Sequence, residues 1–178
     1  MDIEVKDDYL DGHFWESLKH LFTANPSCMR WSFGDVVDDS CFEGNPLDNF
    51  QFSHMFYQAM SPVSPHWNDI IDPFNWITKD LPIEGLLKMK ANINPRHTEV
   101  IRHGFHTDVP FVKKELHGDL FKTGILYMNT NNGYTELEDG TKVESVANRL
   151  LIFPAHMKHS GTTCTDQEFR CVLNFTYF

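Results

Sequence analysis

The chain has 178 residues and a formal net charge of −10, and 41% of its residues are hydrophobic. This length is typical of one domain with a substantial core, and no apolar run approaches the roughly 20 residues of a transmembrane helix, so we expect a soluble protein with no membrane partner. The acidic charge would repel phosphate backbones and no cluster of lysines and arginines offsets it, so we expect no nucleic-acid partner either.

The first residues bear on the cellular compartment of the protein. Residues 1–14 are acidic and lack the basic start and apolar stretch of a signal peptide, so we expect a cytoplasmic protein. In that reducing compartment the four cysteines, which show no CxxC spacing, are expected to be free thiols and not zinc ligands. They are Cys28, Cys41, Cys164 and Cys171.

Helical patterns occupy the first half of the chain. Leu10, Phe14, Leu18 and Leu21 recur at helical spacing, behind acidic residues that can cap a first turn. Residues 23–48 follow as a long loop rich in glycine, proline, aspartate and serine, which makes this segment a candidate lid.

Two further helices are predicted before residue 82. One rests on the spacing of Phe52, Met55, Phe56 and Ala59. The other begins at Ser64-Pro65, and Pro73 must end or kink it.

From about residue 86 the pattern changes to short runs of β-branched and aromatic residues, separated by turn dipeptides such as Asn132-Gly133. Strands are predicted at 86–94, 98–108, 122–129, 134–138, 141–145, 149–153 and 168–178. We therefore predict one domain over 1–178, with helical support and a possible lid over about 1–82. A double-sheet jelly roll is predicted over about 86–178, which makes the fold class α+β with an all-β core.

A metal site is predicted where His106 and Asp108 lie two residues apart at the end of a strand, because such side chains point to the same face. An imidazole and a carboxylate are two ligands of the arrangement that leaves open positions on non-haem iron(II). His159, which follows a strand end and a proline, is the best candidate for the third ligand. The alternative for the pair alone is a chance occurrence in a chain with ten histidines.

The last predicted strand carries Arg170, Val172 and Asn174 on one face. A buried guanidinium needs a partner, and its fork matches a carboxylate, so a dicarboxylate co-substrate is predicted there. The alternative is an internal salt bridge. Tyr127 offers a phenolic hydrogen bond to the same carboxylate, although an ordinary strand aromatic is the simpler interpretation. In the strand from residue 86, three polar residues alternate with apolar ones and are candidates to face the cavity: Lys90, Asn92 and Asn94.

These features together resemble the prolyl-4-hydroxylase-like branch of the Fe(II)- and 2-oxoglutarate-dependent oxygenases. The resemblance covers roughly residues 86–178 and rests on an ordered set of motifs. These are HxD at His106 and Asp108, Tyr127-Met128-Asn129, the glycine-to-glycine run from Gly133 to Asp139-Gly140, Arg149 to Pro154, His159 and Arg170.

The resemblance implies a double-stranded β-helix with iron at its mouth. Its residues would be His106, Asp108 and His159 as metal ligands, Arg170 binding the distal carboxylate of 2-oxoglutarate, Tyr127 assisting it, and Asn174 near that carboxylate. The implied activity is a dioxygenase that hydroxylates an unactivated C–H of a small molecule or peptide. It would consume O2 and release succinate and CO2. Asp108 stands where a glycine or alanine would admit a halide, so hydroxylation is favoured over halogenation.

Three points remain open at this level. His103 and His156, each three residues before a candidate ligand, are interpreted as structural or supporting residues. A cupin-type metalloenzyme is an alternative, although cupins would require an HxH pair and a following glutamate. The non-enzymatic alternative is a β-sandwich binding or virion-associated module whose histidines are incidental.

Overall fold

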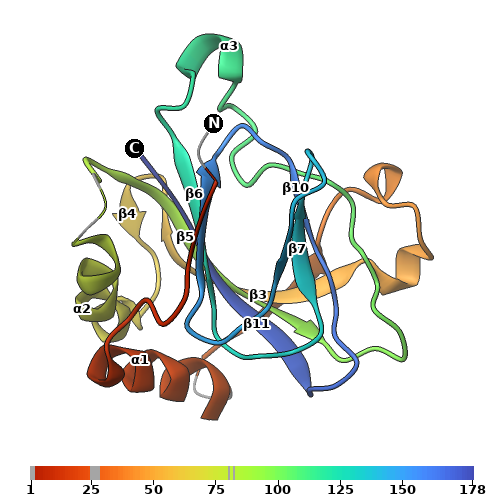
Figure 1. Cartoon of the computed structure of the whole chain (residues 1–178), viewed down its shortest axis with the longest axis horizontal. Coiled ribbons are helices and arrows are strands. Elements are labelled where there is room, and N and C mark those ends of the chain that lie inside the picture. Colours follow the sequence, from red (N-terminus) through yellow and green to blue (C-terminus); the bar gives the residue numbers. More distant parts are fainter. Residues whose placement is uncertain (1–2, 25–28, 80, 82) are drawn as a thin grey trace.

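A computed structural model describes residues 3–24, 29–79, 81 and 83–178. Two antiparallel β-sheets face each other, and the two longer helices lie together outside the larger sheet (Figure 1). No helix in these ranges is long and apolar enough to cross a membrane.

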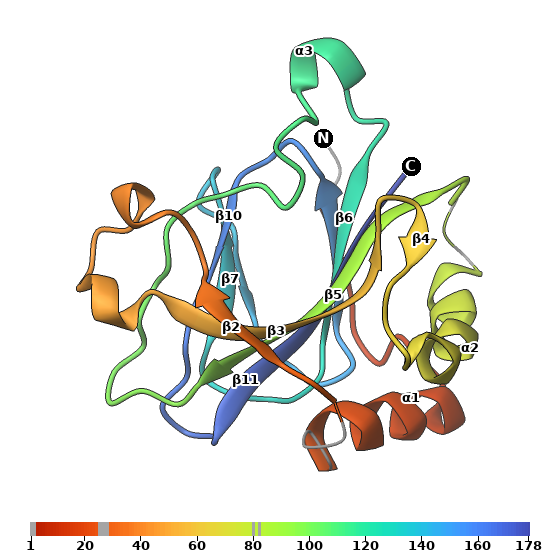
Figure 2. The same cartoon turned by 180° about the vertical axis from the view of Figure 1, so that it is seen from behind.

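The larger sheet carries most of the chain. Its strand order is β1-β9-β6-β11-β5-β3-β2, with β4 paired to β3. Strands β2 and β3 extend the sheet past β5, as the view from behind shows (Figure 2). The bounds are β1 (Glu4–Lys6), β2 (Ser32–Asp35), β3 (Phe50–Gln58), β4 (Ser61–Pro62), β5 (Leu86–Pro95), β6 (Lys122–Tyr127), β9 (Leu150–Pro154) and β11 (Phe169–Tyr177).

The smaller sheet has the order β10-β7-β8. It consists of β7 (Tyr134–Leu137), β8 (Lys142–Glu144) and β10 (His159–Gly161). Apolar side chains from both sheets form a shared core between them, including Ile125, Leu137, Leu151 and Phe153. This core holds the two sheets together.

The helices cover the outer face of the larger sheet. Helix α1 (Gly12–Lys19) begins after Asp11, whose side chain accepts a hydrogen bond from the Phe14 amide, and it continues as π-helical turns over His20–Ala24. Helix α2 (Trp67–Thr78) follows β4, whereas the short α3 (Lys114–His117) projects from the connection between β5 and β6. Leu18, Ile70 and Ile77 are fully buried against the sheet.

Strand β11 separates the helix-side core from the space between the sheets. Cys171, Leu173 and Phe175 belong to the core beneath the helices, and Val172 belongs to the core between the sheets. This alternation follows from the two-residue period of a strand. It places Arg170 and Asn174 on one face, as the sequence predicted, and the structure shows that this face lines the space between the sheets.

The structure confirms most of the predicted strands of the second half, the first helix and the mainly antiparallel β architecture. Three of the predicted free cysteines, Cys41, Cys164 and Cys171, are free, whereas Cys28 lies outside the described residues. The predicted third helix corresponds to α2, which runs through position 73 and ends at Thr78.

Three expectations were wrong. The predicted helix around Phe52 to Ala59 is strand β3, so the first half is less helical than expected. The predicted strand 98–108 forms only two isolated bridges, at Arg102 and His106. The predicted loop 23–48 contains β2 and the 3-10 turns Asp39–Cys41 and Pro46–Asp48, while residues 25–28 lie outside the described residues.

Truncating Leu173 tests the importance of the helix-side core. Leu173 is fully buried in the centre of β11, so Leu173→Ala leaves a cavity and should lower the free energy of unfolding by about 2–5 kcal/mol. Urea denaturation followed by circular dichroism measures the change. Leu116→Ala, at an exposed position of α3, is the control and should shift stability by less than about 0.5 kcal/mol. Equal effects of the two changes would contradict the assigned core.

Candidate metal centre and adjoining pocket

Backbone pairing brings the two candidate histidine ligands together. The His106 amide donates to the His159 carbonyl at 3.0 Å, and the His159 amide donates back to the His106 carbonyl at 2.9 Å. His159 begins β10, whereas His106 lies in the irregular segment between β5 and α3. Gly104 permits this path, because a Cβ there would lie 2.1 Å from the Cys41 carbonyl oxygen. The segment must therefore pack backbone against backbone.

His106, Asp108 and His159 form a compact cluster. One ligand atom from each lies within 4.8 Å of the others, and Nε2 of His159 is 3.6 Å from Oδ2 of Asp108. Asp108 and His159 are buried and His106 is half-buried. The sequence prediction that these three side chains converge agrees with this geometry, although His106 and Asp108 do not lie on a regular strand.

The hydrogen bonds of the cluster fit a bound cation. Nδ1 of His106 is 3.1 Å from the Gly104 carbonyl, which can only accept, so this nitrogen carries the proton and Nε2 has a free lone pair. Oδ1 of Asp108 accepts no hydrogen bond from the described residues, and the Lys90 ammonium lies 3.5 Å from it. Two imidazoles and one carboxylate suit a divalent transition metal with open positions, and the residues present therefore fit such an ion.

The charge states of the ligands also suit a metal. Burial alone would raise the pKa of Asp108, but the ammonium of Lys90, together with His159, His106 and Lys88, holds it well below its usual range. Burial lowers the pKa of His159 to about 3, and it lowers the pKa of His106 against the attraction of Asp108. At neutral pH the carboxylate is therefore charged and the imidazoles are neutral, as metal binding requires.

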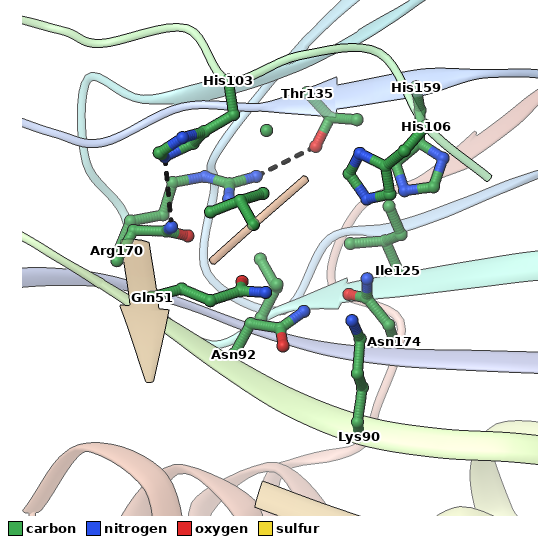
Figure 3. A pocket seen from close by; sticks show the side chains of 14 residues that line it. Gln51, Lys90, Asn92, His103, His106, Ile125, Thr135, His159, Arg170 and Asn174 are labelled. Carbon is green, nitrogen blue, oxygen red and sulfur yellow. Dashed lines mark hydrogen bonds between the residues drawn. The ribbon is translucent and has the colours of Figure 1, made fainter. Parts of the chain in front are cut away.

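A polar pocket adjoins the histidines, and Arg170 lies at its other end (Figure 3). The guanidinium is buried, and it donates from Nε to the Ser145 hydroxyl at 2.7 Å and from Nη2 to the Thr135 hydroxyl at 2.9 Å. Within the described part of the chain no carboxylate forms an ion pair with it. The internal salt bridge that the sequence left open is therefore not seen, and a buried positive charge faces the pocket without a counter-ion. We call this the arginine pocket.

The other two predicted co-substrate residues differ in position. Tyr127 is buried, with its ring 5.6 Å from the guanidinium of Arg170, and its hydroxyl donates to the Val143 carbonyl at 3.4 Å. Asn174 lies at the histidine end of the pocket, where Nδ2 is 3.4 Å from Oδ2 of Asp108. Asn174 therefore lies beside the metal ligands and not beside Arg170.

The sequence predicted some of the residues around the arginine pocket and missed others. Lys90, Asn92 and Asn94 line the pocket, as their alternation on β5 predicted. Thr135 and Ser145 were not singled out, although Thr135 is a buried polar residue of β7. The spacing of such isolated hydroxyls carries no recognisable signal.

His103 was interpreted as a supporting residue, and it is absent from the cluster of candidate ligands. It nevertheless lines the arginine pocket, where it is almost fully buried and lies 3.4 Å from the Asn94 amide. Burial, with the positive charge of Arg170, lowers the pKa of His103 to about 4. The ring is therefore neutral at physiological pH.

Comparison with known proteins gives a match at the level of structure. No family model and no curated protein sequence matches the chain. A prolyl hydroxylase from Trichoplax adhaerens, in complex with a hypoxia inducible factor oxygen degradation domain peptide fragment, matches with a TM-score of 0.68 and 14% identity, over 99% of this chain and 83% of that one. A 2-oxoglutarate–Fe(II) oxygenase family oxidoreductase from Burkholderia pseudomallei matches with a TM-score of 0.67 and 10% identity, over 98% and 84%.

A third solved structure has a different reaction. The non-haem α-ketoglutarate-dependent epimerase SnoN of nogalamycin biosynthesis matches with a TM-score of 0.61 and 11% identity, over 99% of this chain and 76% of that one. At these identities the likeness shows the fold alone. The chain has the fold of the 2-oxoglutarate–Fe(II) oxygenases.

The buried histidines predict a pH dependence of stability. His103 has a folded pKa of about 4, below its usual 6.5, so between these values the unfolded chain binds a proton that the folded chain does not. The free energy of unfolding of the metal-free protein should therefore fall as the pH drops from about 6.5 to 4. Urea denaturation at several pH values measures this slope. His103→Gln should reduce the slope by about 1 kcal/mol per pH unit, and an unchanged slope would show that His103 does not titrate this way.

Proposed function

We propose that this protein is an Fe(II)- and 2-oxoglutarate-dependent oxygenase that hydroxylates an unactivated C–H bond, in the manner of the prolyl hydroxylases. The observation that carries the proposal is the pairing of two unsatisfied groups across one pocket. A metal-ligand cluster lies at one end, and at the other lies a buried guanidinium that has no carboxylate partner among the described residues. A small dicarboxylate that chelates a metal would satisfy both groups.

In this proposal, His106, Asp108 and His159 hold the iron. Bound iron(II) with 2-oxoglutarate supplies the oxidising chemistry, in which O2 is consumed, succinate and CO2 are released, and one oxygen atom enters the substrate. The protein contributes orientation, because the backbone pairing between His106 and His159 sets the spacing of the two imidazoles. Asn174 steadies the Asp108 carboxylate by donating to Oδ2.

Arg170 binds the distal carboxylate of 2-oxoglutarate in this scheme. The Ser145 and Thr135 hydroxyls already hold two of its donor nitrogens, so the guanidinium is oriented before the co-substrate arrives. The Tyr127 ring under the guanidinium stabilises the same orientation through a cation–π contact. Burial excludes water, which strengthens the ion pair that would form.

Two matched structures bear on the choice of substrate. The Trichoplax adhaerens enzyme was solved with a peptide, which supports a peptidyl substrate, whereas the epimerase shows that the same fold serves other reactions. Hydroxylation is preferred here because Asp108 completes the ligand set and leaves no position for a halide.

Anaerobic titration with iron(II) and 2-oxoglutarate tests the proposal. The wild-type protein should develop the weak visible charge-transfer band of the metal-bound co-substrate. Asp108→Ala removes the carboxylate ligand and should abolish the band. Arg170→Met removes the distal partner and should weaken 2-oxoglutarate binding about 100-fold, because a buried charge pair is worth roughly 2–5 kcal/mol.

Arg96→Met is the matched control, because Arg96 is an exposed arginine directly after β5, the strand that pairs with β11. It should leave the band and the affinity unchanged. Absence of the band from folded wild-type protein would reject the oxygenase proposal. Loss of the band in Arg96→Met would show that the assay does not report on the arginine pocket.

A further inference from the structure

A second pocket adjoins the metal cluster on the side of Asp108. His106 and His159 line the arginine pocket, whereas Asp108 lines this second one, so the three candidate ligands lie between the two. Most of its lining is apolar, including Met60, Leu87, Val109 and Phe111. We call it the apolar groove. If 2-oxoglutarate occupies the arginine pocket, the groove offers a substrate a place beside the candidate ligand residue Asp108.

The turn that borders the groove is built from unexpected residues. Ala59 and Met60, between β3 and β4, have φ angles of 51° and 60°. Two successive residues in this left-handed region form the type of turn that favours asparagine and glycine, and other residues there cost of the order of 1–3 kcal/mol each. Met60 is nevertheless 62% exposed. Neither the turn geometry nor burial in the core accounts for a methionine at this position. Contact with a ligand in the groove would account for it.

Lys88 places one positive charge in this apolar setting. Its Nζ donates to the main-chain carbonyl of Asp108 at 3.0 Å, and among the described residues it has no carboxylate within ion-pair distance. The next residue on the same face of β5, Lys90, is 3.5 Å from Oδ1 of Asp108. The Asp108 carboxylate therefore pairs with Lys90, while Lys88 contacts only the main-chain carbonyl of the same residue.

Metal binding would increase this imbalance. A divalent ion on Asp108 engages the carboxylate that now faces Lys90, and the two charges of 2-oxoglutarate are met by the metal and by Arg170. The ammonium of Lys88 then faces the groove with no anion of its own. A single ammonium in an apolar groove matches a monoanion better than a phosphate dianion, whose second charge would be left without a partner.

We propose that the apolar groove takes a substrate in which an apolar body carries a carboxylate, and that Lys88 pairs with this carboxylate while Met60 and Phe111 contact the body. Lys88 is thereby a specificity-determining residue, since it holds the substrate beside Asp108 and the metal. This inference rests on the proposed function, because it takes the cluster between the two pockets as the reaction centre.

Binding of matched acids and amides tests the inference. The probes are hexanoate, 4-phenylbutyrate, N-acetyl-leucine and an acetylated peptide with one glutamate, each paired with its neutral amide. Ligand-detected NMR measures their dissociation constants on the protein loaded anaerobically with iron(II) and 2-oxoglutarate. We expect at least one acid to bind about tenfold more tightly than its amide, and the position of that acid in the panel distinguishes a free acid from an acidic peptide.

Three variants locate this preference. Lys88→Met should remove the acid–amide difference, and Lys88→Arg should restore it. Met60→Asn suits the turn, so it should fold well and weaken an acid and its amide by similar factors. Lys142→Met, at an exposed lysine of β8 in the smaller sheet, is the control and should retain the full preference.

The charge-transfer band is recorded for each sample, because it distinguishes a failure of the proposed function from a failure of the inference on Lys88. No band in the wild type would reject the proposed function itself. With the band present, the inference is overturned if no acid of the panel binds more tightly than its amide, or if the preference survives in Lys88→Met. Loss of the band in Lys88→Met would also overturn it, because Lys88 would then support the Asp108 backbone instead of a ligand.

Discussion

The pairing register of β11 with β5 is the constraint on which both the core and the site depend. Arg170 pairs with Asn94, Val172 with Asn92 and Asn174 with Lys90, so all of these polar side chains point into the space between the sheets. A shift of one residue would move Arg170 into the apolar core beneath the helices and expose Leu173 to the pocket. Packing of the helices on Leu173 and its neighbours fixes this register, and it thereby places the Arg170 guanidinium in the pocket between the sheets.

Within the described part of the chain, the site contains buried charges that lack partners of opposite charge, and bound ligands would supply such partners. Among the described residues, the Asp108 carboxylate pairs with Lys90, Lys88 meets only the main-chain carbonyl of Asp108, and the buried Arg170 has hydroxyl partners but no carboxylate. Such groups cost free energy when they are left uncompensated, so they are poor elements for stability alone. A metal and a dicarboxylate in the arginine pocket, with a carboxylate substrate in the apolar groove, would give Asp108, Arg170 and Lys88 each a partner of opposite charge.

The wrong expectations have identifiable physical causes. In β3 the pairing register shifts between Met55 and Tyr57, so the strict alternation is broken and Phe52, Met55 and Phe56 mimic helical spacing. The segment 98–108 is rich in residues that favour strands, yet it makes only isolated bridges because it packs against the turn at Cys41 through Gly104. Both features depend on neighbours distant in the sequence.

The sequence by itself determined most strands of the second half, the two faces of β11 and the identity of the candidate ligands, because period-two alternation and an HxD motif are local patterns. Only the tertiary structure decided that His159 meets His106 through backbone pairing, that Thr135 and Ser145 hold Arg170, and that Asn174 contacts Asp108. It also decided that Lys88 faces an apolar groove beside the metal cluster. These contacts join residues 20 to 66 positions apart, and no local pattern specifies which distant side chain will complete them.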